Sequence, residues 1–118
     1  MGRFSDTRVA KWLNEIDTVW LSMHHENPDL SSPVTSEISG GSYDRLEILF
    51  GAAQSRYITN ITGGKYSGLP TSMVTHFGGW TSQHGGDFEF DIELETPKRL
   101  KLGQSLTINP GDLVLSIY

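Results

Sequence analysis

Histidine and carboxylate side chains are the groups in this chain whose types and spacing could do chemistry. The run His24-His25-Glu26 offers two imidazoles and a carboxylate, which are good ligands for zinc or iron. Adjacent residues of a strand point to opposite faces, so His24 and His25 cannot easily hold one ion. No further tight cluster of histidines follows. We therefore expect no metal here, with His24 at the end of a strand and His25 and Glu26 in a solvated loop.

Acid–base catalysis would need a histidine beside an acid and a nucleophile. His76 lies between apolar neighbours in a strand pattern, and His84 lies in a glycine-rich loop close to Asp87 in the sequence. The nearby hydroxyl side chains do not stand in the Gly-x-Ser-x-Gly turn that presents a nucleophile; they are Ser72, Thr81 and Ser82. We therefore expect no enzymatic activity and no catalytic residue, and we interpret His76 as a strand residue with a hydrogen-bond partner.

Carboxylates stand at every second position from residue 87 to residue 95. The row is Asp87, Glu89, Asp91, Glu93 and Glu95. Such a row could bind calcium, dock a basic partner, supply a glycosidase pair, or form a solvated face that discourages edge pairing. We favour the solvated face, with docking as the second interpretation. The glycine pairs at 63–64 and 85–86 are not followed by a helix pattern, so we interpret them as turn glycines and expect no phosphate-containing cofactor.

The aromatic side chains could stack on sugars or form a subunit interface. Trp80 stands next to two glycines and a polar loop, so it is the tryptophan that we expect to be exposed. A core position is expected for most of the other aromatic residues. The candidate interface or ligand contacts are Trp12, Trp80, His84, Asp87, Glu89, Asp91 and Glu93.

These side chains must be positioned by a mainly β fold. Thirteen glycines stand between short runs rich in Val, Ile, Thr, Tyr and Phe, which is typical of short strands joined by tight turns. The 118 residues suffice for one core, and no internal repeat is visible. We predict one domain over residues 1–118: an N-terminal helical segment at 1–17 and a β-sandwich or jelly roll at 18–118.

One short helix is expected near the N-terminus. Ser5 or Asp6 can cap it. Its apolar residues follow the spacing of one helical face; they are Val9, Trp12, Leu13 and Ile16. Because so short a helix does not persist alone in water, it must dock this face on its own β core or on a neighbouring subunit. We favour its own core.

Strands are expected at 18–23, 43–50, 56–61, 72–80, 87–95, 105–108 and 113–117, with loops at 27–33, 63–64, 82–86 and 109–112. The clearest alternation places four apolar residues in the core, opposite the carboxylates; these are Phe88, Phe90, Ile92 and Leu94. Pro97 should end that strand. An antiparallel hairpin would then set Arg99 and Lys101 beside the carboxylates and partly neutralise them.

Charge and hydropathy exclude several classes of protein. The net charge of −5 argues against nucleic acid as a partner, because phosphate binding depends on clustered Lys and Arg. No apolar run approaches the length of a membrane span, and the first residues lack the apolar core of a signal peptide. There is no cysteine and so no disulfide. We expect a chain made in the cytoplasm that leaves the cell by another route, such as lysis.

Two segments carry a resemblance to a known family. They are Val19-Trp20-Leu21-Ser22-Met23-His24-His25-Glu26-Asn27-Pro28 and Ser36-Glu37-Ile38-Ser39-Gly40-Gly41-Ser42-Tyr43-Asp44-Arg45. In this order and spacing they resemble a family of short tailed-phage virion proteins described as tail fibre or head decoration proteins. The likeness continues through Val74-Thr75-His76-Phe77-Gly78, the glycines at 85–86 and the closing segment 102–113. It therefore covers nearly the whole chain.

Two positions depart from the family pattern. His25 stands where threonine is common, and Gln104 replaces the first aspartate of the closing segment. These departures would matter only if the two positions bound an ion. The resemblance implies a structural virion component without catalytic residues.

We therefore expect a bacteriophage virion protein that is made in the host cytoplasm and assembled on the phage particle. The leading hypothesis is a capsid decoration or cement protein, a minor capsid protein that binds the major capsid protein outside the head and stabilises the shell. It would do so as a symmetric homo-oligomer such as a trimer. One alternative is a tail fibre or baseplate component. Another is a carbohydrate-binding module that adheres to the host through Trp80, and a small hydrolase is third.

Overall fold

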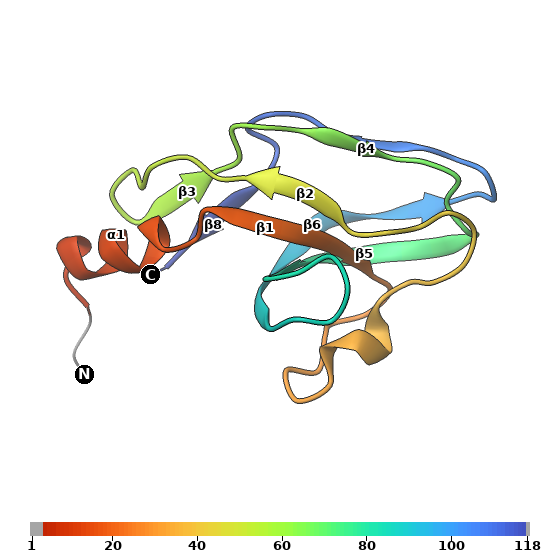
Figure 1. The fold of residues 1–118 in the computed structure, drawn as a ribbon, viewed down its shortest axis with the longest axis horizontal. Coiled ribbons are helices and arrows are strands. Elements are labelled where there is room, and N and C mark those ends of the chain that lie inside the picture. Colours follow the sequence, from red (N-terminus) through yellow and green to blue (C-terminus); the bar gives the residue numbers. More distant parts are fainter. Residues whose placement is uncertain (1–3, 118) are drawn as a thin grey trace.

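The structure is a computed structural model and describes residues 4–117. It is mainly β with one short N-terminal helix, as predicted (Figure 1). The described elements are α1 (Asp6–Asn14), β1 (Thr18–His24), the 3-10 turn η1 (Pro33–Ser36), β2 (Leu46–Leu49), β3 (Tyr57–Thr59), β4 (Gly64–Tyr66), β5 (Ser72–Trp80), β6 (Phe88–Leu100), β7 (Leu106–Ile108) and β8 (Val114–Ser116).

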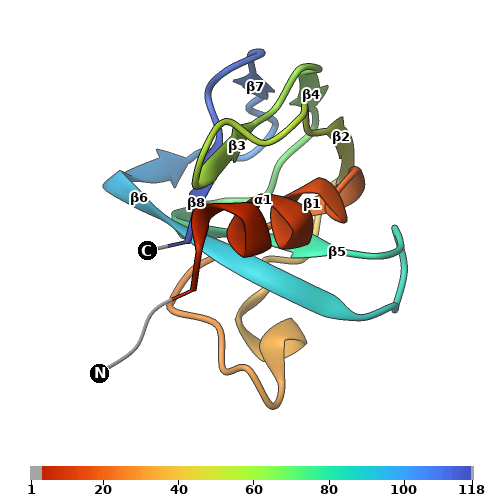
Figure 2. The same ribbon diagram turned by 90° about the vertical axis from the view of Figure 1, so that its left-hand side faces the viewer.

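A four-stranded antiparallel sheet forms one layer, with the strand order β2-β1-β5-β6. Two antiparallel ribbons, β3 with β8 and β4 with β7, complete the β structure of the described residues. Figure 2 shows β3, β4 and β7 on one side of β5 and β6, so the ribbons lie across one face of the sheet. The predicted β-sandwich is thus confirmed as two layers of antiparallel strands.

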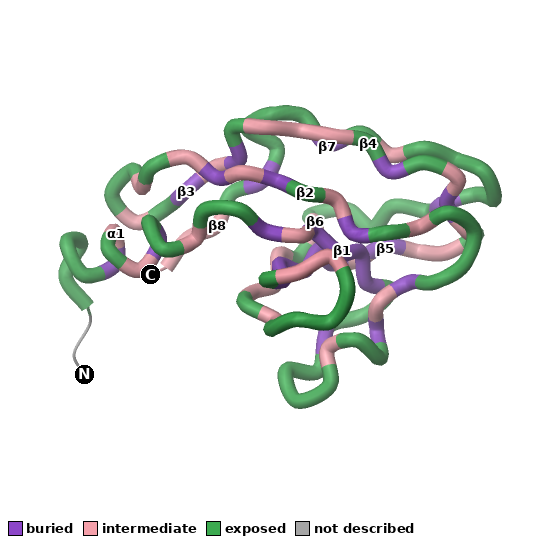
Figure 3. The backbone as a smooth tube through the Cα atoms, viewed as in Figure 1, coloured by how far each residue is buried: buried purple, intermediate pink, exposed green. Residues whose placement is uncertain are grey.

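The hydrophobic core lies between these layers, as the buried segments in Figure 3 show. Alternate residues of β1 point into it because the side-chain period of a strand is two. The sheet and the ribbons both contribute fully or almost fully buried residues, among them Val19, Leu21, Met23, Ile48, Ile58, Tyr66, Phe77 and Ile108. In β1, however, Ser22 and His24 on the other face are buried as well. A further segment must therefore cover that second face.

Helix α1 has the predicted cap and packs on its own domain. The Ser5 Oγ accepts a hydrogen bond from the Arg8 backbone N–H at 3.2 Å. Val9 and Leu13 have no exposed surface and belong to the main core. Trp12 is half-buried, and the ring of Phe4 packs edge-to-face on it with centroids 4.5 Å apart. No helix within residues 4–117 is long and apolar enough to cross a membrane.

Several strands have the predicted positions, and one was missed. Strand β5 has the predicted bounds, and β1 extends one residue further. Strand β2 begins only at Leu46, because residues 40–43 form a turn in which the Tyr43 backbone N–H donates to the Gly40 carbonyl oxygen at 3.2 Å. The missed strand is β4: the sequence predicted a loop at residues 63–64, and the structure has a strand that begins at Gly64. It forms because Gly63, which has no Cβ, leaves room for the carbonyl oxygen of Ile108, so the β4–β7 ribbon can close.

The prediction that Pro97 ends a strand and begins a hairpin is wrong, because strand β6 continues past it. The strand runs through Pro97 to Leu100. It can do so because it is an edge strand, and its register on β5 jumps from Glu93 to Lys98, so Pro97 lies in a bulge where no ladder bond to β5 is required. Arg99 therefore does not fold back on the carboxylates. Within residues 4–117 neither it nor Lys101 forms an ion pair, and the predicted neutralisation is wrong.

A second bulge in β6 moves one predicted core residue to the other face. The register opposes Phe88 to Trp80 and Phe90 to Gly79, so Glu89 is the extra residue of the bulge. Phe90 packs toward the core, as predicted. Phe88 instead lies on the opposite face, where its ring meets that of Trp80 edge-to-face at a centroid distance of 5.1 Å.

Candidate functional site

A buried polar cluster lies on the face of the sheet opposite the core. Ser22 and His24 of β1 and Trp80 of β5 point to this face, because the register places them on neighbouring strands. Residues 25–45, which we call the covering segment, fold over them. Two backbone hydrogen bonds tie its middle to β1, from the His25 N–H to the Ser36 carbonyl oxygen and from the Ile38 N–H to the Met23 carbonyl oxygen, and together they form an isolated bridge between residues 24 and 37.

His24 is held between two serine hydroxyls. Its Nε2 lies 2.6 Å from the Ser22 Oγ, and its Nδ1 lies 2.7 Å from the Ser36 Oγ. Burial lowers the pKa of His24 to about 4, although the nearby Glu37 carboxylate acts in the opposite direction. The imidazole is therefore neutral near pH 7, and both ring nitrogens are occupied. His24 does end its strand as predicted, and His25 is exposed.

Arg45 connects the covering segment to the loop before β6. Its Nε and Nη2 donate to the two carboxylate oxygens of Glu37 at 3.0 and 2.9 Å, a bidentate ion pair. Its Nη1 donates to the carbonyl oxygens of Ser82 and Gly85 at 3.1 and 2.7 Å. The guanidinium carbon lies 3.8 Å from the ring centroid of Trp80. The arginine side chain is only 6% exposed.

Two tyrosine hydroxyls satisfy the backbone of β1 where its pairing with β2 stops. Tyr43 donates to Glu37 at 2.6 Å and accepts from the Met23 backbone N–H at 3.1 Å. Tyr66 donates to the Leu21 carbonyl oxygen at 2.6 Å. Burial raises the pKa of Tyr43 above its ordinary value, and the Glu37 carboxylate adds to the rise, so the phenol stays protonated and can donate.

Two shallow depressions flank the stack of Arg45 on Trp80. The first, of about 510 Å³, is lined mainly by polar residues of the covering segment and by His84. The second, of about 390 Å³, lies between residues 31–34 and the glycines at 85–86. At the rim of the first, the Nε2 of His84 lies 3.2 Å from an oxygen of Asp44. His84 thus stands beside Asp44 rather than Asp87, and its side chain is 77% exposed.

Trp80 is not exposed, which corrects the prediction. Only 5% of its surface is accessible, because Arg45 and Phe88 pack on its ring. Its indole N–H donates to the Ser22 Oγ at 2.8 Å. A sugar ring therefore could not stack freely on this indole.

The remaining candidate contacts do not meet in one site. Trp12 lies on α1, whereas the carboxylate row lies along β6. Asp87, Glu89 and Glu93 are exposed and Asp91 is half-buried. Their role as contacts stays a prediction. Within residues 4–117, no three His, Cys, Asp or Glu side chains are placed so that they could hold a metal ion.

Sequence reasoning missed the ion pair of Arg45 with Glu37 and the serine–histidine–serine chain. A signal was present, because all five residues stand in the two segments that carry the family resemblance. The structure brings these segments together as one bonded unit. With its bonding groups paired in this way, the unit can hold the covering segment and the 82–86 loop rigidly on the sheet.

Comparison with known proteins gave one family. Residues 8–116 match the family model described as "Podophage GP4 fiber I protein gp80". The match includes both segments of the buried polar cluster and every described strand. No curated protein matches the chain.

Proposed function

Because the chain belongs to the podophage GP4 fiber I protein gp80 family, it is a phage virion structural protein, and we propose that it is a component of the tail fibre. The family match over residues 8–116 carries this proposal, since the family description names a fibre. Location on the phage particle follows from the same membership. Its location in the tail of the particle is the part that we propose.

The arrangement of the buried polar cluster supports a mechanical role. A fibre component has to keep its surface loops in place under load, and Arg45 joins two such loops through bonds to Glu37, Ser82 and Gly85. Such side-chain networks rigidify a fold when their members are satisfied. The absence of enzymatic activity remains a prediction.

The experiment is to separate heads from tails of purified virions and to identify this chain in each fraction by mass spectrometry. We expect it in the tail fraction, with the major capsid protein as the marker of heads and a tail tube protein as the marker of tails. Recovery in the head fraction alone would overturn the fibre assignment. Cryo-electron microscopy of the intact virion would then locate the copies.

A capsid decoration role is the second candidate. The covering segment exposes two apolar side chains, Leu30 at 75% and Val34 at 60%, which could be buried against a lattice of major capsid protein. This role would place copies on the shell at its symmetry axes. The same fractionation therefore decides between the two candidates.

Adhesion to a host carbohydrate was a further alternative. The burial of Trp80 removes the stacking platform on which it depended. We take the first depression, where Asp44 and His84 are exposed, as the candidate glycan site. A glycan array compared with an Asp44→Ala variant tests this: selective binding that the variant loses would favour adhesion, and no binding would leave the assembly role.

A further inference from the structure

The outer edge of β6 is the open edge of the four-stranded sheet. Strand β6 has 13 residues and pairs only with β5 within residues 4–117. At the opposite edge the backbone of Leu49 in β2 is already bonded, because its N–H donates to the Thr62 Oγ1 at 3.0 Å and its carbonyl oxygen accepts from the Ile61 N–H at 2.9 Å. An open strand edge presents unpaired N–H and C=O groups to another chain.

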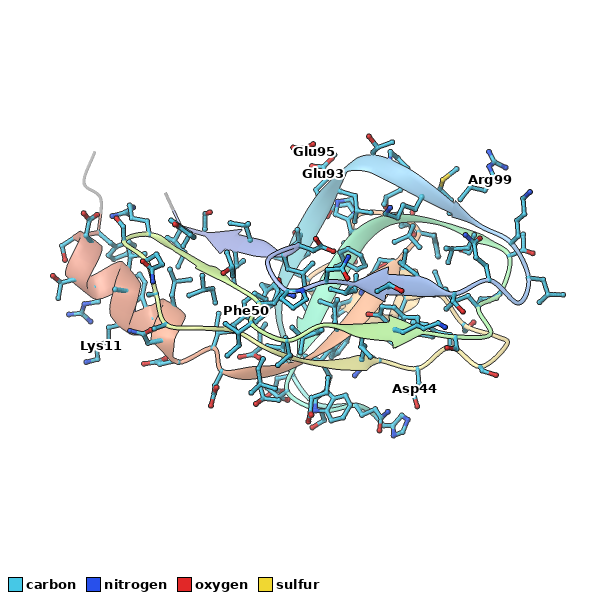
Figure 4. All side chains as sticks on the ribbon, turned by 90° about the horizontal axis from the view of Figure 1, so that it is seen from above. Lys11, Asp44, Phe50, Glu93, Glu95 and Arg99 are labelled. Atoms are coloured by element: carbon cyan, nitrogen blue, oxygen red, sulfur yellow. The ribbon has the colours of Figure 1, made fainter. Side chains whose placement is uncertain are left out.

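The charges along this edge are separated into two halves. Four carboxylates precede Pro97 in β6 and two cations follow it; they are Glu89, Asp91, Glu93 and Glu95, then Lys98 and Arg99. None of them takes part in an ion pair within residues 4–117. Figure 4 shows Glu93, Glu95 and Arg99 projecting from the same outer margin of the molecule. The carboxylates and the cations of β6 are therefore complementary in charge, but they form no ion pairs with each other within residues 4–117.

We propose that a second copy of this chain docks antiparallel along β6, about a two-fold axis that passes near Thr96. In this register Glu93 of each copy stands opposite Arg99 of the other. A two-fold contact is self-complementary, so this pair occurs twice. Opposite charges directly across an antiparallel pair stabilise it. The proposal goes beyond the fibre role, because it holds wherever on the particle the protein lies.

An adjoining groove gives the second copy apolar surface to bury. A depression of about 520 Å³ lies beside β6 and is lined by both β6 and the ribbon strands. Its apolar lining includes Ile92, Leu94, Leu106 and Val114. Val114 is 49% exposed. Pro97 has no N–H to donate, so it shortens any backbone ladder, and the charged side chains then set the register.

The first test measures the mass of the full chain in solution by light scattering over a range of concentrations. We expect a monomer–dimer equilibrium that weakens as salt is raised, because exposed charges are screened. Two single reversals, Glu93→Lys and Arg99→Glu, should each weaken the dimer about tenfold or more, because each places like charges opposite one another twice. The double variant Glu93→Lys/Arg99→Glu should restore the dimer, because the complementarity is then exchanged.

Exposed charges elsewhere provide the matched controls. Glu26→Lys on the covering segment and Lys65→Glu on β4 should leave the dimer unchanged. Circular dichroism checks that each variant is folded. A monomer at every concentration, a trimer mass, or failure of the Glu93→Lys/Arg99→Glu double variant to restore the dimer would each overturn the proposal.

The second test uses the absence of cysteine from the chain. A residue on a two-fold axis meets its own copy, and two cysteines can form a disulfide when their Cα atoms are about 4.4–6.8 Å apart. Thr96→Cys should therefore give a covalent dimer under mild oxidation. Thr35→Cys, at an exposed position of η1, should not. Equal cross-linking of the two variants would contradict the register.

Discussion

At the scale of single residues, Arg45 is the side chain on which the covering segment depends. Its guanidinium forms an ion pair with Glu37, donates hydrogen bonds to two loop carbonyl oxygens and stacks on the ring of Trp80. The arginine side chain is almost fully buried. The net contribution of a buried ion pair to stability is small, because both charges lose their hydration when they are buried. The loss of one partner is costly, because the other charge stays buried without compensation.

Replacing Arg45 by methionine should therefore lower the free energy of unfolding by about 3–5 kcal/mol. Chemical denaturation monitored by circular dichroism measures this. Lys65→Met, at an exposed position, is the control and should change stability by no more than about 0.5 kcal/mol. The double variant Arg45→Met/Glu37→Gln should lose less than the sum of the two single variants. Equal stability of Arg45→Met and Lys65→Met would contradict the role of the pair.

The buried imidazole of His24 predicts a loss of stability in mild acid. Its pKa is about 4 in the fold against about 6.5 in the unfolded chain. The unfolded chain therefore binds more protons between these values, so the stability present above pH 6.5 is lost as the pH falls toward 4. The slope from this group reaches at most about 1.4 kcal/mol per pH unit.

Denaturation midpoints measured from pH 7 to pH 4.5 test this prediction. His24→Asn should remove the histidine part of the slope, whereas His25→Asn should retain it because His25 is exposed. A slope that is the same in both variants would mean that another group causes the loss.

At the scale of elements, the turns and bulges decide which residues reach the cluster. Gly40 and Gly41 both have positive φ, at 108° and 56°, and turn the covering segment between Glu37 and Arg45. The Ser42 backbone N–H then donates to the Gly68 carbonyl oxygen at 2.7 Å. The turn therefore brings the carboxylate and the guanidinium together while it also joins a loop that is distant in sequence.

Gly41→Ala should destabilise the fold more than Gly103→Ala does. Both glycines have positive φ, where a non-glycine residue costs of the order of 1–3 kcal/mol. A Cβ at Gly41 would also collide with the Gly68 carbonyl oxygen, whereas a Cβ at Gly103 would meet nothing within 4 Å. Thermal unfolding of the two variants isolates the collision. Equal midpoints would show that the covering segment can shift without cost.

At the scale of the whole molecule, one core joins the helix, the sheet and the ribbons. Val9 and Leu13 of α1 belong to the same buried cluster as Ile58 of β3 and Ile108 of β7. Residues distant in sequence therefore share their stabilising contacts. A division of the chain into separately folding parts is not expected from such packing.

Unfolding should accordingly be a single cooperative transition. Tryptophan fluorescence, which reports on Trp12 of the helix and on Trp20 and Trp80 of the sheet, should give the same midpoint as far-UV circular dichroism. The Trp12→Phe variant assigns the signal of the helix. Different midpoints for the two probes would indicate that the helical segment unfolds on its own and would contradict one domain over residues 1–118.

The sequence by itself determined the features that depend on near neighbours. The Ser5 cap, the bounds of β5 and the turn from Asn109 to Asp112 all follow from local chemistry, since capping, alternation and turn residues act over a few positions. The family also could be predicted, because the motif segments retain their order along the chain.

Only the tertiary structure decided what depends on contacts between distant segments. Trp80 is buried because Arg45, which lies 35 positions earlier, stacks on it, and no local pattern contains that contact. Strand β6 passes Pro97 because it lies at a sheet edge, and strand order is not a local property. The bulge at Glu89 likewise changes which face Phe88 occupies, since a single extra residue reverses the alternation from which the face was predicted.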